Sequence, residues 1–169
     1  MGEYRPFDLD SYFAGIQGSP CFICGIVNSA DESHHVIYRD DVAIVFLNKY
    51  PTLYGYTLVA PVEHREQVTG DFSMEEYLTL QKVVYRVGEA LRLELEAERV
   101  YILSLGSQQG NRHVHWHVAP LPPGVPFEEQ QFEALMVSRK GYLALSNDDV
   151  SALAQRLATR LADLGADNP

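Results

Sequence analysis

Three of the six histidines lie in one short segment, His113-Val114-His115-Trp116-His117, at every second position. In an extended chain successive side chains point to opposite faces, so the three imidazoles share one face, about 6.5–7 Å apart between i and i+2. A shift of one residue would bury them and expose Trp116. Such a face can ligate a metal ion, or a neutral imidazole on it can attack phosphorus while its neighbours donate to the phosphoryl oxygens. The alternative is a half-exposed strand that carries histidines without a function.

A second group of candidate residues is the pair Cys21 and Cys24, which are separated by two residues. Three interpretations fit this spacing: two buried and inert thiols, a redox pair, or two ligands of a zinc ion. A thioredoxin-like redox pair lies between a strand and a helix of a βαβ unit, and nothing near these cysteines supplies one. Thiolates combined with imidazoles form closed tetrahedral zinc sites, so we favour structural zinc.

The apolar pattern predicts the elements that must position these residues. Runs rich in Val, Ile, Tyr and Leu, separated by turn formers, predict strands at residues 35–39, 42–48, 56–60, 99–105 and 112–119. Ser73, followed three residues later by Glu76, predicts a capping box at the start of a long helix. Helices are predicted at residues 73–95, 127–137 and from 146 onward, and a polar loop at 106–111.

This order of elements favours an α+β fold, with an antiparallel meander packed on helices. We expect an irregular lead-in over residues 1–20, a main domain over 21–125, and a C-terminal helical extension over 126–169 that packs on the same domain. His34 and His35 open the first strand of the main domain. We expect them to face solvent and assign them no role.

Composition limits the classes of protein that remain. The chain has 169 residues, of which 46% are hydrophobic, and this suits one globular domain. Its formal charge of −10 disfavours binding to a nucleic-acid polymer or an anionic membrane, although a nucleotide in a local pocket stays possible. Two cysteines exclude a disulfide-rich scaffold. Since no apolar run approaches the ~20 residues of a membrane span and the first residues lack a signal-peptide pattern, we expect a cytoplasmic protein.

Three segments in the same order resemble the histidine-triad (HIT) family. HVHWHVA matches its pattern His-φ-His-φ-His-φ-φ, in which φ is apolar. CFICGI is similar to the Cys-x-x-Cys opening of zinc-containing members, and FLNKYPTLYGYTLVAPVEHREQV is similar to the segment that carries Gly-His and a later His. The resemblance covers about residues 21–120. It implies a HIT-like fold with an antiparallel sheet of about five strands and a long central helix, here followed by a C-terminal helical extension.

The resemblance implies an enzyme, because members of this family are nucleotide hydrolases and nucleotidyl transferases. The catalytic group would be the triad His113, His115 and His117. His115 would form a covalent nucleotidyl-histidine with the α-phosphate, and His117 would donate to the phosphoryl oxygen as charge builds. An imidazole near its ordinary pKa of ~6.5 is a competent nucleophile at pH 7. The nucleotide substrate would be a dinucleoside polyphosphate or a nucleoside phosphoramidate.

The resemblance also implies binding residues for the nucleotide. Asn48 would bind the ribose hydroxyls through its amide. Phe22, Ile26 and Phe46 would form an apolar pocket for the base, and Ser107 and Gln109 would contact the phosphates. An amide suits a ribose diol because it both donates and accepts hydrogen bonds.

A structural zinc ion and a homodimer are two further implications of the resemblance. The zinc ligands would be Cys21, Cys24, His64 and His113. Such a site would attach the N-terminal segment to the catalytic strand. Family members commonly form homodimers, so we expect one here, with the apolar residues 83–95 as a candidate contact.

The chain departs from the family pattern at two positions near the triad. The family's Gly-His is Gly55-Tyr56 here, and Gly110 takes the place of a frequent hydroxyl residue. These departures leave the choice of leaving group open and motivate an alternative, a nucleotide-binding module with impaired catalysis. A second alternative is a metal-dependent hydrolase that uses the HxHxH strand, although that strand has no Asp or Glu to complete a metal site.

Overall fold

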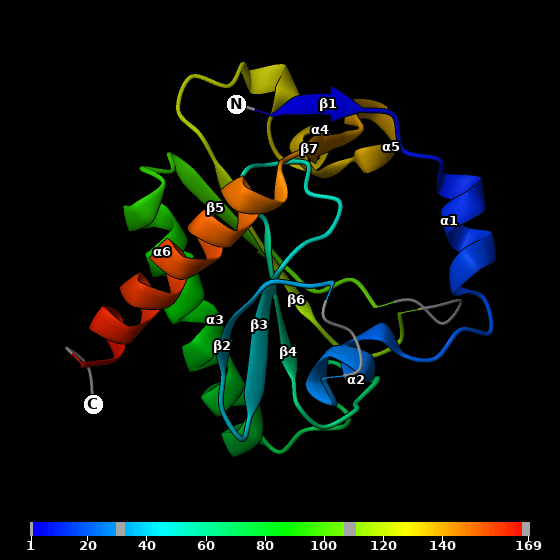
Figure 1. Cartoon of the computed structure of the whole chain (residues 1–169). Helices are drawn as coiled ribbons and strands as arrows, with labels where there is room; N and C mark the ends of the chain where they lie inside the picture. Colours follow the sequence, from blue (N-terminus) through cyan, green and yellow to red (C-terminus); the bar gives the residue numbers. More distant parts are fainter. Residues whose placement is uncertain (1, 30–32, 107–110, 167–169) are drawn as a thin grey trace.

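A five-stranded antiparallel sheet forms the centre of the computed structural model, which describes residues 2–29, 33–106 and 111–166 (Figure 1). Its strands lie in the order β2-β3-β4-β6-β5. Their bounds are Val36–Arg39 for β2, Ala43–Leu47 for β3, Thr57–Pro61 for β4, Arg99–Leu103 for β5 and Trp116–Leu121 for β6. The turn between β2 and β3 is held by Asp40, whose carboxylate accepts from the backbone N–H groups of Val42 and Ala43. The predicted α+β fold is confirmed.

Two long helices cover one face of the sheet. They are α3, Met74–Glu94, and α6, Asn147–Ala166, which pack on each other (Figure 1). The predicted capping box is present at the start of α3, since Ser73 accepts from the backbone of Glu76 and Glu76 accepts from that of Ser73. Among the described residues, no helix combines the length and the apolar character that crossing a membrane requires.

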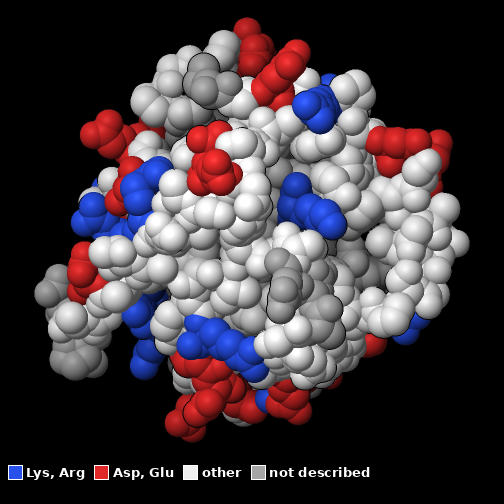
Figure 2. Space-filling model, in the orientation of Figure 1, with Lys and Arg blue, Asp and Glu red and all other residues white. Residues whose placement is uncertain are grey.

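The opposite face of the sheet carries a second hydrophobic core. Helix α2, Phe22–Val27, packs there against alternate residues of the sheet. In β3 the side chains of Ile44 and Phe46 join this core, whereas Val45 points toward α3 and α6. All five residues of β3 are therefore buried. The outer surface is mixed in charge, with basic side chains standing in separate groups among acidic ones on the face in Figure 2.

The sequence predicted an irregular lead-in over residues 1–20, and this prediction is wrong. They contain β1, Glu3–Arg5, and α1, Leu9–Ile16. β1 pairs with β7, Tyr142–Ala144, in a separate two-stranded sheet. β1 has only three residues and pairs with a segment far away in the sequence, so no local sequence pattern predicts it.

The C-terminal extension also differs in part from the expectation. The predicted helix 127–137 is divided into η1, Phe127–Glu129, α4, Phe132–Leu135, and α5, Val137–Lys140. The break follows from the backbone, because Gln131 has a φ of 56° and cannot continue a helix. The later helix from residue 146 is confirmed as α6, with Ser146 accepting from the backbone of Asp149.

Candidate functional site

The triad segment leads into β6 from the loop before it. β6 begins at Trp116, so His113 and His115 precede the strand, and the predicted start at residue 112 is wrong. The backbone N–H of Val114 donates to the carbonyl of Arg65 (2.7 Å), outside the sheet. The side chains still alternate as the sequence predicts. The apolar ones all lie in the core beneath α3: Val114, Trp116 and Val118.

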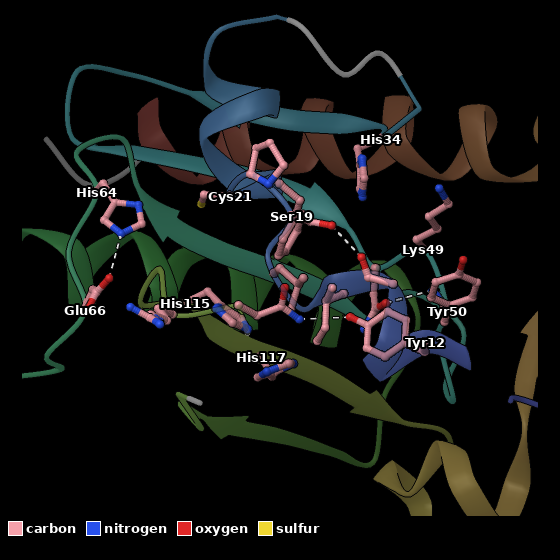
Figure 3. Close-up of a pocket in the computed structure, with 18 of the residues that line it drawn as sticks. Tyr12, Ser19, Cys21, His34, Lys49, Tyr50, His64, Glu66, His115 and His117 are labelled. Atoms are coloured by element: carbon pink, nitrogen blue, oxygen red, sulfur yellow. Dashed lines mark hydrogen bonds and ion pairs between the residues drawn. The ribbon is translucent and has the colours of Figure 1, made fainter. Parts of the chain in front are cut away.

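A cavity of about 570 Å³ lies beside the last two histidines of the triad (Figure 3). The ring centres of His115 and His117 are 4.8 Å apart, and both rings line this cavity. Phe22 from α2 and Asn48, directly after β3, line it as well. A volume of this size lies in the range of small-molecule sites.

His115 has a defined tautomer. Its Nδ1 lies 2.7 Å from the backbone carbonyl oxygen of His113. A carbonyl oxygen only accepts, so Nδ1 carries the proton and Nε2 keeps its lone pair. Burial lowers the pKa of His115, which keeps the ring neutral at pH 7. The ring can therefore act as a nucleophile through Nε2.

His117 contacts a residue that the family pattern does not contain. The hydroxyl of Tyr56 lies 3.1 Å from Nδ1 of His117. Burial, and secondarily the neighbouring His115, lowers the pKa of His117 to about 3, while burial raises the pKa of Tyr56 to about 12. Both groups are thus uncharged at neutral pH.

One wall of the cavity is aromatic and includes a residue that the sequence reasoning missed. His34, expected to face solvent, is half-buried and lines the cavity (Figure 3). Its ring centre lies 5.9 Å from that of Phe22 and 5.6 Å from that of Phe46. Phe46 and Ile26 are buried in the core around α2, and neither is among the described residues that line the cavity. His35 is also half-buried. No local pattern could have placed His34 here, since both partners are distant in sequence.

The segment before the triad contributes two further lining residues, Asn111 and Arg112. The amide of Asn111 donates to the hydroxyl of Tyr12 (3.0 Å), so α1 reaches the cavity although the sequence reasoning gave this region no role. Ser107 and Gln109, the expected phosphate contacts, lie outside the described residues.

The four expected zinc ligands come together next to the triad. Their ligand atoms all lie within 4.8 Å of one another. Sγ of Cys24 is 3.3 Å from Nδ1 of His64 and 3.6 Å from Nδ1 of His113, and Sγ of Cys21 is 3.5 Å from the same Nδ1 of His113. Tetrahedral zinc with ordinary bond lengths would separate sulfur and nitrogen ligands by about 3.5 Å. These distances fit a zinc ion.

The second nitrogen of each histidine in this group supports the same conclusion. Nε2 of His113 donates to the carbonyl of Pro61 (2.9 Å), and Nε2 of His64 lies 3.3 Å from the carboxylate of Glu66. Each contact places the proton on Nε2 and leaves Nδ1 free to face the sulfur atoms. Such outer partners orient histidines in metal sites.

The comparison with protein families shows to which family this chain belongs. The family model of the HIT domain matches residues 29–123, more than half of the chain. The chain belongs to the HIT family. It is 31% identical over 103 residues to an uncharacterised HIT-like protein of Saccharolobus solfataricus, covering 59% of this chain and 73% of that relative. A similar relative from Borreliella burgdorferi is 31% identical over 104 residues, covering 59% of this chain and 74% of the relative.

Solved structures show the HIT fold as well. A hypothetical histidine triad nucleotide-binding protein of Sulfolobus tokodaii matches with a TM-score of 0.71 at 23% identity, covering 88% of this chain and 96% of that one. A zinc-bound histidine triad family protein of Mycobacterium smegmatis matches with a TM-score of 0.68 at 24% identity, covering 88% and 97%. The resemblance noted in the sequence is confirmed, including its zinc-containing type, and membership of the HIT family supports a nucleotide-binding, hydrolase-type activity in general.

Proposed function

We propose that this HIT protein cleaves a nucleoside phosphate derivative at its α-phosphate through a covalent intermediate on His115. The observation that carries the proposal is the hydrogen bond from Nδ1 of His115 to the carbonyl of His113, which leaves the Nε2 lone pair on a ring that lines the cavity. A nucleophile of this kind divides one difficult displacement into two easier ones.

In the first step the Nε2 lone pair of His115 forms a bond to the α-phosphorus. The bond between phosphorus and the leaving group breaks, and its electron pair departs with that group. The imidazole becomes positively charged, and the carbonyl of His113 stabilises this charge through the Nδ1–H bond. His117 donates to a phosphoryl oxygen as negative charge builds there. Water then attacks the same phosphorus, and the P–Nε2 bond breaks with its electron pair returning to Nε2. The water loses its proton to solvent, the nucleoside monophosphate is released and the ring is neutral again.

Three regions of the cavity would bind the nucleotide. Phe22 and His34 offer ring faces to a base. Asn48 would contact the ribose, and its side chain has a fixed orientation because its Oδ1 accepts from the backbone N–H of Tyr50 (2.9 Å). Lys49, which also lines the cavity, adds positive charge in a protein whose formal charge is −10.

The cysteine–histidine group would hold a structural zinc ion. Cys21 and Cys24 at the start of α2, together with His64 after β4 and His113, supply four ligands and thus a closed site. Bound zinc would join α2 to the triad segment. The reaction needs nothing from it beyond this positioning.

The contacts of His113 argue against a catalytic metal bound by all three triad histidines. His113 directs Nδ1 at the cysteines and uses Nε2 on the carbonyl of Pro61, so neither nitrogen is available to a metal shared with His115 and His117. The HxHxH segment therefore offers two histidines, and no carboxylate, to a metal in the cavity.

The test is to trap the intermediate. Wild-type protein is incubated with a panel of nucleotides, quenched in acid and analysed by intact-mass spectrometry, beside His115→Gly. We expect a mass increase of one nucleotidyl group in the wild type only, and a fall in turnover of at least about 1,000-fold in the variant. A His115→Gly protein that still turns over would contradict the covalent mechanism. Nucleotide binding without adduct or turnover in the wild type would instead favour the binding-module alternative.

A further inference from the structure

Tyr56 stands where the family pattern has a histidine, and its side chain reaches the reaction site. It is only 6% exposed and lies directly before β4, the strand that pairs with β6. Its hydroxyl lies 3.1 Å from Nδ1 of His117, with the ring centres 5.7 Å apart. The residue that departs from the family pattern therefore contacts the triad itself.

The direction of this hydrogen bond follows from the groups around it. Within the described residues, Nδ1 of His117 is the one hydrogen-bond partner recorded for the Tyr56 hydroxyl. A buried hydroxyl proton needs an acceptor, and the lone pair on Nδ1 supplies it. The phenol therefore donates, and His117 as a neutral ring carries its own proton on Nε2. Donation to Nδ1 also strengthens Nε2–H as a donor.

Few groups near His117 could transfer a proton to a leaving group. His115 and Tyr56 face it: the proton of His115 lies on Nδ1, where it is donated to the carbonyl of His113, and the buried phenol of Tyr56 is uncharged at pH 7. Figure 3 places Lys49 beside Tyr50 at one end of the cavity and Glu66 beside His64 at the other, with the two triad histidines between them. Arg112, which also lines the cavity, stays protonated at any ordinary pH.

We propose that Tyr56 is a positioning residue that holds His117 as a neutral donor through Nε2, and that the site therefore favours nucleoside phosphoanhydrides over phosphoramidates. This inference rests on the proposed function, because it concerns the leaving group of the same reaction. When the bond from Nε2 of His115 to phosphorus forms, the P–O bond of an anhydride breaks and its electron pair stays on the departing phosphate oxygen. That anion is stable at pH 7 and needs no proton.

A phosphoramidate makes a different demand on the site. Breaking its P–N bond would leave the electron pair on an amine nitrogen, which must receive a proton as it departs. A general acid does this best when its pKa lies near the working pH. The lone pair on Nδ1 of His117 is already engaged by the Tyr56 hydroxyl, and burial lowers the pKa of the ring to about 3, so it carries no second proton at pH 7. It can stabilise phosphoryl oxygens by hydrogen bonding, but it does not supply the proton that an amine requires.

The tautomer can be measured without any substrate. Protein labelled with ¹⁵N-histidine is recorded in long-range ¹H–¹⁵N NMR spectra at pH 7, with His117→Gln to assign the ring. We expect the Nε2–H pattern for His117 in the wild type and a mixture of tautomers in Tyr56→Phe. A wild-type ring protonated on Nδ1, or a pattern unchanged in Tyr56→Phe, would overturn the positioning role.

Kinetics test the substrate class with a matched pair, a dinucleoside tetraphosphate and a 5′-phosphoramidate of the same nucleoside. In the wild type kcat/KM should favour the anhydride by at least about tenfold. Tyr56→Phe should lower kcat on the anhydride about three- to tenfold with KM little changed. Tyr56→His, which places a second titratable ring beside His117, should reduce the preference for the anhydride. Tyr4→Phe is the matched control, because it removes a hydroxyl that donates to Thr52 outside the cavity, and it should leave both rates unchanged.

The outcomes separate this inference from the proposed function. If both substrates are cleaved through an adduct but the phosphoramidate is equal or better, the inference about the leaving group is wrong and the proposed function stands. If neither forms an adduct, the proposed function fails and the substrate preference fails with it, while the NMR spectra still decide the role of Tyr56.

Discussion

The three imidazoles of the triad differ in what each ring nitrogen contacts. His113 directs Nδ1 at two thiols, His115 donates Nδ1–H to a backbone carbonyl, and Nδ1 of His117 lies 3.1 Å from the phenol hydroxyl of Tyr56. In the proposed mechanism, a single segment would thus supply a zinc ligand, a nucleophile and a hydrogen-bond donor. The alternation of side chains brings the three rings to one region, but the partner of each second nitrogen decides its chemistry.

The burial of His117 predicts a pH dependence of folding stability. Its pKa is about 3 in the folded protein and ~6.5 in an unfolded chain, so between these values the unfolded chain binds the additional proton. This contribution to stability is complete above pH 6.5 and is lost as the pH falls toward 3. From pH 7 to pH 5 the loss should be about 2 kcal/mol.

Urea denaturation of the wild type and His117→Gln at pH 5 and pH 7, in excess zinc, measures this difference. The variant should lose about 2 kcal/mol less than the wild type on acidification, because glutamine does not titrate. Equal losses in the two proteins would show that His117 does not make the expected contribution.

The sequence could place the triad side chains but not the contacts that tune them. The alternation of Val114 and Trp116 with the histidines reports which face each side chain takes, and the structure agrees. The partners are Pro61 of β4 and Tyr56 directly before that strand, so the tautomers depend on tertiary structure. His34 was missed for the same reason, since its neighbours Phe22 and Phe46 are brought to it only by folding.

At the scale of elements, local patterns succeeded where an element is long or capped by its own residues. α3 and α6 carry apolar stripes over many turns, and Ser73 and Ser146 accept from backbone N–H groups three residues ahead. β1 and β7 have three residues each and exist because they pair with each other. Their pairing joins two segments that the sequence reasoning had treated as separate.

Gly141 offers a test of how much this pairing depends on backbone shape. It has a φ of 76° and a ψ of −169°, a region essentially reserved for glycine, and an added Cβ would collide with the backbone carbonyl of Arg5. Gly141→Ala should cost about 1–3 kcal/mol, felt first in the two-stranded sheet. Amide hydrogen exchange should become faster in β1 and α1 and stay slow in β3.

Gly15→Ala is the control for this substitution. It adds the same methyl group within α1 at a position where the new Cβ meets nothing within 4 Å. It should leave exchange unchanged or slow it, since alanine favours helix over glycine by up to about 1 kcal/mol. If Gly141→Ala behaves like this control, the pairing does not depend on the glycine conformation.

At the scale of the molecule, bound zinc would connect α2, the segment after β4 and the triad. A metal that binds only the folded protein stabilises it by about 2.7 kcal/mol when its concentration is 100 times Kd. Removing it with a chelator should lower Tm by roughly 5–11 °C for a chain of this size. A double variant with Cys21→Ser and Cys24→Ser should show no such metal-dependent change.

Activity after chelation separates structural from catalytic metal. At temperatures where the chelated protein is still folded by circular dichroism, turnover should stay within about threefold of the zinc-loaded value, because the proposed nucleophile is a nitrogen of His115. Loss of turnover in folded protein would support the metal-dependent alternative instead.

One edge of the central sheet offers a surface for assembly. β5 is an edge strand, and among the described residues β6 is the one strand that pairs with it, while α3 packs on its face. Long open edges tend to pair with another strand. Exposed apolar side chains lie on this strand and on α3: Ile102, which faces Gly88 of α3, is 49% exposed, and Tyr85, three residues before Gly88, is 64% exposed. Most of the apolar residues in the expected contact 83–95 are buried in the core of the single chain, so the candidate contact on α3 narrows to the exposed Tyr85 and Leu93, together with β5.

We propose that a second copy of the chain occupies this edge, β5 against β5, in agreement with the homodimer that family resemblance implies. Light scattering after size-exclusion chromatography should give about twice the mass of the chain for the wild type. Ile102→Lys with Tyr85→Glu should shift it to the monomer, because charges in an apolar contact lose hydration without gaining partners. Met74→Lys, at a 74% exposed position at the start of α3, is the matched surface control and should stay dimeric. A wild type that is monomeric at micromolar concentration would contradict the dimer. A double variant that remains a dimer would show that the contact lies elsewhere.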